Sequence, residues 1–86
     1  MSTAFDVRIS ARAERGLDRL PEKIASACVA FIFGPLAQQP YRVGGELRGR
    51  MAGLRSARRG TYRTIYRVEG DAVDVVHIDH RGDVYR

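Results

Sequence analysis

Arginine side chains cluster in one segment of this chain, between Tyr41 and Val68. The segment has eight arginines and one acidic residue, Glu46, so its charge of +7 (eight minus one) exceeds the +5 of the whole chain. A guanidinium group pairs with a phosphate through two hydrogen bonds, whereas an ammonium group acts as a point charge. The clustering therefore predicts a binding site for a polyanion. The eight residues are Arg42, Arg48, Arg50, Arg55, Arg58, Arg59, Arg63 and Arg67.

A two-residue turn at Gly60-Thr61 is predicted to place two of these arginines opposite each other. Glycine in the first turn position supplies the positive φ that a type II′ hairpin requires. In the resulting register Arg58 pairs with Arg63, and like charges directly opposed on one sheet face repel each other. A bound anion is the simplest compensation for this pair.

The following turn, Gly70-Asp71, predicts how the next two strands pair. In that register Arg58, Arg63 and His80 share one face at one end of the sheet, and we assign His77 to the opposite, helix-covered face. A single β-bulge would undo this alignment. The predicted pairs are Arg67 with Asp74, Ile65 with Val76, Arg63 with Ile78, and Thr61 with His80.

Strands and helices that would position these residues follow from the hydrophobic pattern. Alternating or apolar stretches predict strands at 5–9, 54–59, 62–68 and 72–79, with a short last strand at 84–86. On the face away from the paired arginines lies an apolar patch that two helices could cover. The patch consists of Tyr66, Val68, Val73 and Val75.

Two helices are predicted between the first strand and the arginine-rich segment. Ser10 offers an N-cap oxygen to the first helix, and Pro21 suits the start of the second. Gly34-Pro35 should end or kink the second helix, and the glycines and proline of 37–46 indicate a loop. The apolar positions are Ala13, Leu17 and Leu20 in the first helix, and Ile24, Cys28 and Phe31 in the second, widened by Ala27 and Ile32.

These elements predict an α+β fold in one small domain covering residues 1–86: two N-terminal helices on a mainly antiparallel sheet of four to five strands.

The single cysteine, Cys28, cannot form an internal disulfide and lies on an apolar stripe, so we expect it in the core. No Cys/His pair has zinc-ligand spacing, and we expect no metal and no cofactor. The N-terminus lacks an apolar signal region and no segment is long enough to span a bilayer, so we expect a cytoplasmic protein without a membrane partner.

Three motifs in the C-terminal half resemble the RelE family of bacterial toxin-antitoxin modules. The chain has the family's order of Leu-x-Gly, Gly-x-Tyr-Arg-x-Ile-Tyr and His-Arg-x-x-Val-Tyr, and the predicted strand and two helices match its architecture. The segment 56–63 is also similar to the variant found in mycobacterial members. The motifs stand at Leu47-Arg48-Gly49, at Gly60-Thr61-Tyr62-Arg63-Thr64-Ile65-Tyr66, and at His80-Arg81-Gly82-Asp83-Val84-Tyr85.

The resemblance implies a metal-independent endoribonuclease that cuts mRNA in the ribosomal A site. The 2′-hydroxyl of the RNA attacks the adjacent phosphate, so the protein must position the strand, stabilise charge on phosphorus and move two protons. The motif match implies that Arg63 and then Arg81 hold the scissile phosphate, with Arg58 on the same or the neighbouring one. Tyr85 matches a tyrosine with a base-stacking or proton-transfer role. Ser56 stands where the family often has a cation, a departure that favours slow or ribosome-dependent catalysis.

Proton transfer is the step for which the sequence offers fewest groups. Arginine keeps its proton to a pKa above ~12, and tyrosine has a reference pKa of ~10. His80 has a suitable unperturbed pKa and lies next to Arg81, so we include it among the catalytic candidates. Four further arginines of the segment are predicted to bind RNA: Arg48, Arg50, Arg55 and Arg59.

The implied partners are the ribosome, mRNA and a cognate RelB-like antitoxin, which would form a hetero-oligomer with the toxin by laying an acidic or amphipathic segment on it. One alternative is a ParE-type toxin that poisons gyrase without nuclease chemistry. A second is an RNA-binding module without activity, for which the exposed aromatics Tyr41 and Tyr85 are the candidates.

Overall fold

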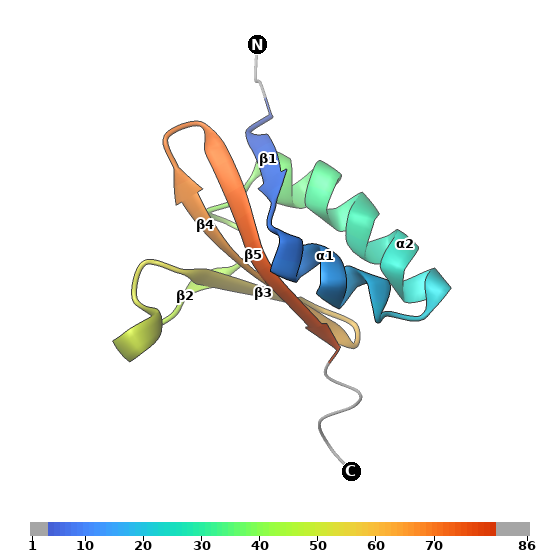
Figure 1. The fold of residues 1–86 in the computed structure, drawn as a ribbon. Coiled ribbons are helices and arrows are strands. Elements are labelled where there is room, and N and C mark those ends of the chain that lie inside the picture. Colours follow the sequence, from blue (N-terminus) through green and yellow to red (C-terminus); the bar gives the residue numbers. More distant parts are fainter. Residues whose placement is uncertain (1–3, 81–86) are drawn as a thin grey trace.

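The structure, a computed structural model, describes residues 4–80. Two helices cover one face of a five-stranded sheet, so the predicted α+β architecture is confirmed (Figure 1). The predicted last strand at 84–86 lies outside the described residues. The elements are β1 (Asp6–Ile9), α1 (Ala11–Asp18), α2 (Glu22–Phe31), the π-helical turn η1 (Ile32–Leu36), β2 (Gly45–Glu46), the 3-10 turn η2 (Gly49–Met51), β3 (Arg55–Arg59), β4 (Tyr62–Glu69) and β5 (Ala72–His80).

The sheet is mixed, with strand order β1-β5-β4-β3-β2. β2 pairs with β3, β3 with β4 and β4 with β5, each time antiparallel, whereas β1 pairs with β5 in parallel. β1 pairs only with the first half of β5, from Ala72 to Val75. The chain then turns into α1, which packs along the second half of β5 (Figure 1).

The core lies between the helices and one face of the sheet. Three of the four patch residues predicted from the sequence, Tyr66, Val73 and Val75, are fully buried, and Val68 packs against them. Cys28 is buried in the same core, as predicted, and burial raises the pKa of its thiol. The hydroxyl of Tyr66 donates a 2.6 Å hydrogen bond to the Pro40 carbonyl oxygen, which satisfies the one polar group of this side chain.

α1 begins as the sequence predicts. The Ser10 Oγ accepts a 3.0 Å hydrogen bond from the backbone N–H of Ala13 and donates one of 3.0 Å to the Val76 carbonyl oxygen. The cap residue therefore joins the helix to β5. Gly16 lets the helix approach closely, because a Cβ at this position would lie only 2.0 Å from the Ile78 carbonyl oxygen.

The region after α2 differs from the prediction. The α-helix ends at Phe31, but a π-helical turn containing Pro35 continues it directly and residues 37–38 are also helical. The wider turn accommodates the missing proline N–H. Within the predicted loop, Gly45–Glu46 forms the short strand β2, and Ala27 is exposed rather than part of the buried stripe.

The first predicted register is confirmed: Arg58 pairs with Arg63, and Gly60 has a φ of 56°. The second holds only at the turn end, where Arg67 pairs with Asp74. Val76 is an extra residue in β5, so beyond it each partner is shifted by one position. The predicted pairs Ile65–Val76, Arg63–Ile78 and Thr61–His80 are wrong, and the observed pairs are Ile65–His77, Arg63–Asp79 and Tyr62–His80.

Candidate functional site

The uncovered face of the sheet carries a row of three charged residues from three adjacent strands. Arg58 on β3 is paired with Arg63 on β4, which is paired with Asp79 on β5. Arg63 Nη2 lies 2.9 Å from Asp79 Oδ2, and about one third of each side chain is exposed. The Asp79 carboxylate therefore partly offsets the predicted repulsion between Arg58 and Arg63, before any external anion binds. Two cations and one anion leave the row with a charge of +1.

His77, rather than His80, is the histidine on this face. Its Nε2 lies 3.5 Å from Asp79 Oδ2, so imidazole, carboxylate and the Arg63 guanidinium adjoin one another. Burial, and next the charge of Arg12 on α1, lower the pKa of His77, and the Asp79 charge only partly opposes them. The assignment of His77 to the helix-covered face is wrong because the bulge at Val76 reverses the orientation of every following residue.

His80 lies on the other side of the sheet from Arg63. It is in register with Tyr62, and its Nε2 lies 3.0 Å from the Thr61 Oγ1. The prediction that His80 shares a face with Arg58 and Arg63 is therefore wrong. The bulge has no signature in the sequence around Val76; in the structure, Ser10 Oγ donates a 3.0 Å hydrogen bond to the carbonyl oxygen of this extra residue.

Arg55 and Arg59 turn toward the helix-covered side of β3. Arg55 Nη2 donates to the carbonyl oxygens of Tyr41 and Gly44, both at 3.1 Å, and its guanidinium lies 5.3 Å from the centre of the Tyr41 ring. The Arg59 guanidinium lies 4.7 Å from the centre of the Phe31 ring and donates to the Val43 carbonyl oxygen. Both arginines hold the chain between α2 and β2 in place, so we do not include them in the candidate face.

The other predicted site residues are spread over different places. Arg48 and Arg50 are exposed in and beside η2, on the loop that projects from the β2 edge (Figure 1). Ser56, which stands where the family often has a cation, pairs with Ile65 and therefore lies on the same sheet face as Arg63. Arg81 and Tyr85 lie outside the described residues.

Several polar atoms at the centre of this face have unused hydrogen-bonding capacity. Arg63 Nε, His77 Nδ1 and Asp79 Oδ1 are buried and have no hydrogen-bond partner among residues 4–80. Side by side, they offer a cation for an anion, a carboxylate that orients the cation, and an imidazole that can accept a proton. Within the described residues no group of three or more His, Cys, Asp or Glu could hold a metal ion.

Comparison with known proteins gives consistent results over almost the whole chain. Residues 7–85 match the family described as ParE toxin of the type II toxin-antitoxin system parDE. Toxin RelE of Mycobacterium tuberculosis (strain ATCC 25618 / H37Rv) is 50% identical over 84 residues, which cover 95% of this chain and 87% of the relative. Toxin RelG of the same strain is 48% identical over 84 residues, covering 95% and 97%.

Solved structures agree with these matches. The toxin-antitoxin complex RelBE2 from Mycobacterium tuberculosis contains a chain with a TM-score of 0.89 and 44% identity, covering 92% of this chain and all of the other. A variant of E. coli toxin RelE in the free state shares the fold, with a TM-score of 0.74 and 18% identity over 91% of this chain and 84% of that one. No helix within residues 4–80 has the length and apolar character needed to cross a membrane. The family match over 7–85 and the two relatives at about half identity show that this chain belongs to the RelE/ParE family and is a toxin of a type II toxin-antitoxin system.

Proposed function

We propose that this toxin is a ribosome-dependent endoribonuclease that cuts mRNA in the ribosomal A site. The observation that carries the proposal is the row of Arg58, Arg63 and Asp79, with His77 beside it, on a sheet face that the helices leave uncovered. A phosphodiester can approach this face, whereas the other arginines of β3 hold loop carbonyls.

Arg63 is the proposed clamp for the scissile phosphate. Its guanidinium has five N–H donors; Asp79 accepts a hydrogen bond from Nη2 and Nε is buried, so Nη1 is left to point at a phosphate. The RNA 2′-oxygen forms a bond to phosphorus and the bond from phosphorus to the 5′-oxygen breaks, which leaves a cyclic phosphate and a 5′-hydroxyl. The phosphate gains negative charge in the transition state, and a fixed guanidinium stabilises it there. Arg58 is proposed to hold the same or the neighbouring phosphate.

His77 is the proposed base for the 2′-hydroxyl proton, in place of His80. Because its pKa is lowered, the ring is neutral and able to accept a proton near neutral pH. The Asp79 carboxylate beside it would stabilise the imidazolium that forms. Arg81 and Tyr85 keep the roles that the family resemblance implies, phosphate binding and base stacking or proton transfer.

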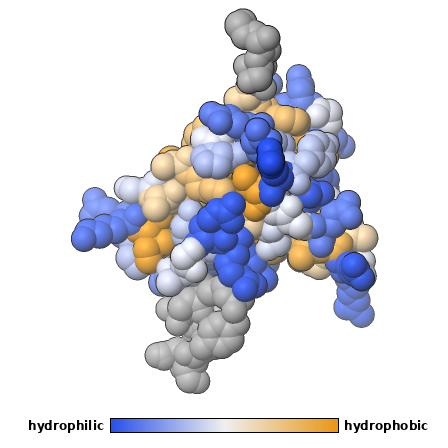
Figure 2. Space-filling model, turned by 180° about the vertical axis from the view of Figure 1, so that it is seen from behind, coloured by the Kyte–Doolittle hydropathy of each residue, from blue (hydrophilic) through white to orange (hydrophobic). Residues whose placement is uncertain are grey.

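A cognate RelB-like antitoxin is the proposed inhibitor, since the related RelBE2 structure is a toxin-antitoxin complex. Hydrophobic residues reach the surface in separate patches between hydrophilic ones on the side seen in Figure 2. Phe33, after α2, is 56% exposed, and Val29 within α2 is 38% exposed. An amphipathic antitoxin segment would bury such residues and place its acidic side chains against the uncovered sheet face.

The test is primer extension on a defined messenger in a reconstituted translation reaction, with a reaction lacking ribosomes as a control. We expect cuts at A-site codons, and a loss of about 100-fold or more in cleavage rate for Arg63→Gln, the size seen when one preorganised donor to an oxyanion is removed. Arg81→Ala and His77→Gln should also slow cleavage.

Arg67→Gln is the matched control. Arg67 lies on the same strand and the same face, but at the opposite end, where its Nη2 is 3.9 Å from Asp74 Oδ2. This variant should cut at the wild-type rate. If the messenger stays intact with the wild-type protein, the nuclease proposal fails. A gyrase cleavage assay then tests the ParE-type function, which the name of the matching family favours.

A further inference from the structure

Three arginines outside the arginine-rich segment lie on one side of α1. Residues 12, 15 and 19 are three and four positions apart, a spacing that aligns side chains along a helix. Glu14 and Asp18 lie on another side, four positions apart. The buried residues Ala13 and Gly16 lie between the two kinds of charge on the packed side of the helix, and on the solvent side Asp18 is three positions from Arg15. The three arginines are Arg12, Arg15 and Arg19.

The basic side of α1 borders a hollow beside the second half of β5. One part of it, of about 230 Å³, is lined by the three arginines, Gly16 and His77. An adjoining part, of about 250 Å³, is lined by Gly16, Arg19 and the end of β5 from His77 to His80. The two parts share three lining residues. Each is several times the roughly 30 Å³ that a water molecule occupies in the liquid, so a hydrated phosphate group fits.

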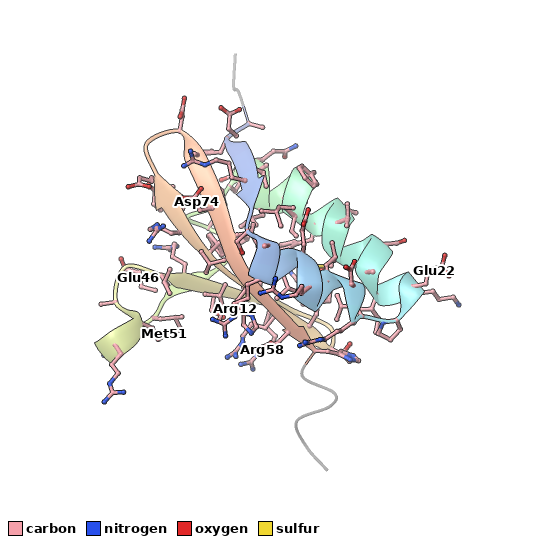
Figure 3. The ribbon with its side chains drawn as sticks, in the orientation of Figure 1. Arg12, Glu22, Glu46, Met51, Arg58 and Asp74 are labelled. Atoms are coloured by element: carbon pink, nitrogen blue, oxygen red, sulfur yellow. The ribbon has the colours of Figure 1, made fainter. Side chains whose placement is uncertain are left out.

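The hollow exists because β1 stops half-way along β5. Beyond Val75, α1 takes the place of a strand and packs on β5 through Gly16, whose missing side chain brings the helix onto the Ile78 carbonyl. The Val76 bulge then turns His77 and Asp79 to the uncovered face, beside this helix. Figure 3 labels Arg12 on α1, and the charges of Arg12 and Arg63 both act on His77.

We propose that this hollow binds a backbone phosphate of single-stranded RNA, next to the phosphate held by Arg63. The inference rests on the proposed function, because it extends the same RNA track from the sheet onto α1. Asp79 belongs to the row at Arg63 and His77 lies beside that row, and both line the hollow, so a strand bound at the row continues into the hollow. Three arginines and no acidic residue line the part of the hollow next to α1, which favours a ligand with repeated negative charge.

Salt-dependent RNA binding tests the proposal without any cleavage. The probe is a short fluorescein-labelled single-stranded RNA, and anisotropy gives its affinity between about 50 and 200 mM salt. The variant is Arg12→Gln with Arg19→Gln. The matched control is Lys23→Gln with Arg42→Gln, both exposed and outside the hollow; each pair lowers the net charge from +5 by two, to +3.

We expect the slope of log affinity against log salt to become shallower in the Arg12/Arg19 variant, by about 0.7 for each RNA phosphate that the variant no longer neutralises. Relative to the control, affinity at the lowest salt should fall about tenfold, which corresponds to about 1.4 kcal/mol for one phosphate. Arg12→Lys with Arg19→Lys should restore most of the slope, since the charges are kept. Circular dichroism and thermal midpoints verify that all variants are folded.

A slope equal to that of the control overturns the proposal, and so does a wild-type protein that does not bind the probe. An Arg12/Arg19 variant that binds RNA normally but binds the acidic antitoxin weakly also overturns it, because the hollow then serves to bind a protein. If the slope falls as expected while wild-type protein leaves messengers uncut on ribosomes, the phosphate site stands and the nuclease proposal fails. If the wild-type protein cuts messengers on ribosomes but the slope of the Arg12/Arg19 variant equals that of the control, the nuclease proposal stands and the phosphate site fails.

Discussion

The two sides of β3 use the same residue type for different purposes. On the helix-covered side, Arg55 is 16% exposed and donates to two loop carbonyls, and Arg59 stacks over Phe31. On the uncovered side, Arg58 is exposed and is opposed by Arg63. The first pair of arginines stabilises the fold, and the second raises the positive potential at the surface. Because a strand alternates its side chains between two faces, the number of arginines in a segment overestimates the number of arginines in a binding site.

The largest effect on stability should come from the covered side. Arg55→Gln removes two charge-assisted hydrogen bonds and leaves the Tyr41 and Gly44 carbonyls without this donor. We expect the free energy of unfolding to fall by about 2 kcal/mol. Urea denaturation measures it, and Arg42→Gln, an exposed change in the same loop, should stay within about 0.5 kcal/mol of wild type. A similar value for both variants would show that Arg55 does not hold the loop.

Ser10→Ala tests the connection between α1 and the bulge that forms the uncovered face. The change removes the N-cap acceptor for Ala13 and the donor to the Val76 carbonyl. We expect a loss of about 1 kcal/mol in the free energy of unfolding. Ser10→Thr keeps a hydroxyl and should lose less. An unchanged urea midpoint in Ser10→Ala would argue against the cap.

Arg58→Gln should have a smaller effect of the opposite sign. It relieves the like-charge pair with Arg63, so the protein should become more stable by about 0.3 kcal/mol at low salt. The gain should vanish near 1 M salt, where charges are screened within about 3 Å. Thermal unfolding at both salt concentrations measures it. A loss of stability in this variant would place Arg58 with the structural arginines of the covered side.

His77 gives the smallest expected effect, a dependence of stability on pH. Its pKa in the folded protein is lowered, mainly by burial and then by Arg12, from an ordinary value of about 6.5. Protonation therefore favours the unfolded chain. This contribution to stability is present above about pH 6.5 and is lost as the pH falls through the folded pKa.

Urea midpoints measured across that range should decrease toward low pH in the wild type, and His77→Gln should show a weaker decrease. His80→Gln is the control, because it changes the only other histidine of the chain. Equal slopes in wild type and His77→Gln would contradict the lowered pKa.

The sequence alone was sufficient to predict the hairpin at Gly60-Thr61 and to identify the sheet face that the helices cover. A two-residue turn with glycine first fixes the register of β3 and β4, and apolar residues two positions apart define the buried side. One of the three motifs that implied the family, Gly60 to Tyr66, lies in this hairpin. These features depend on neighbours in the chain, so they can be read without the fold.

Only the tertiary structure decided which histidine and which charged residues meet on the uncovered face. The Val76 bulge places His77 and Asp79 beside Arg63, and its carbonyl is held by Ser10, 66 positions away in the chain. The parallel strand β1 likewise stops at Val75, and α1 then brings its arginines to β5. An extra residue in a strand costs little locally, and its position is determined by packing between distant segments, which local sequence patterns do not encode.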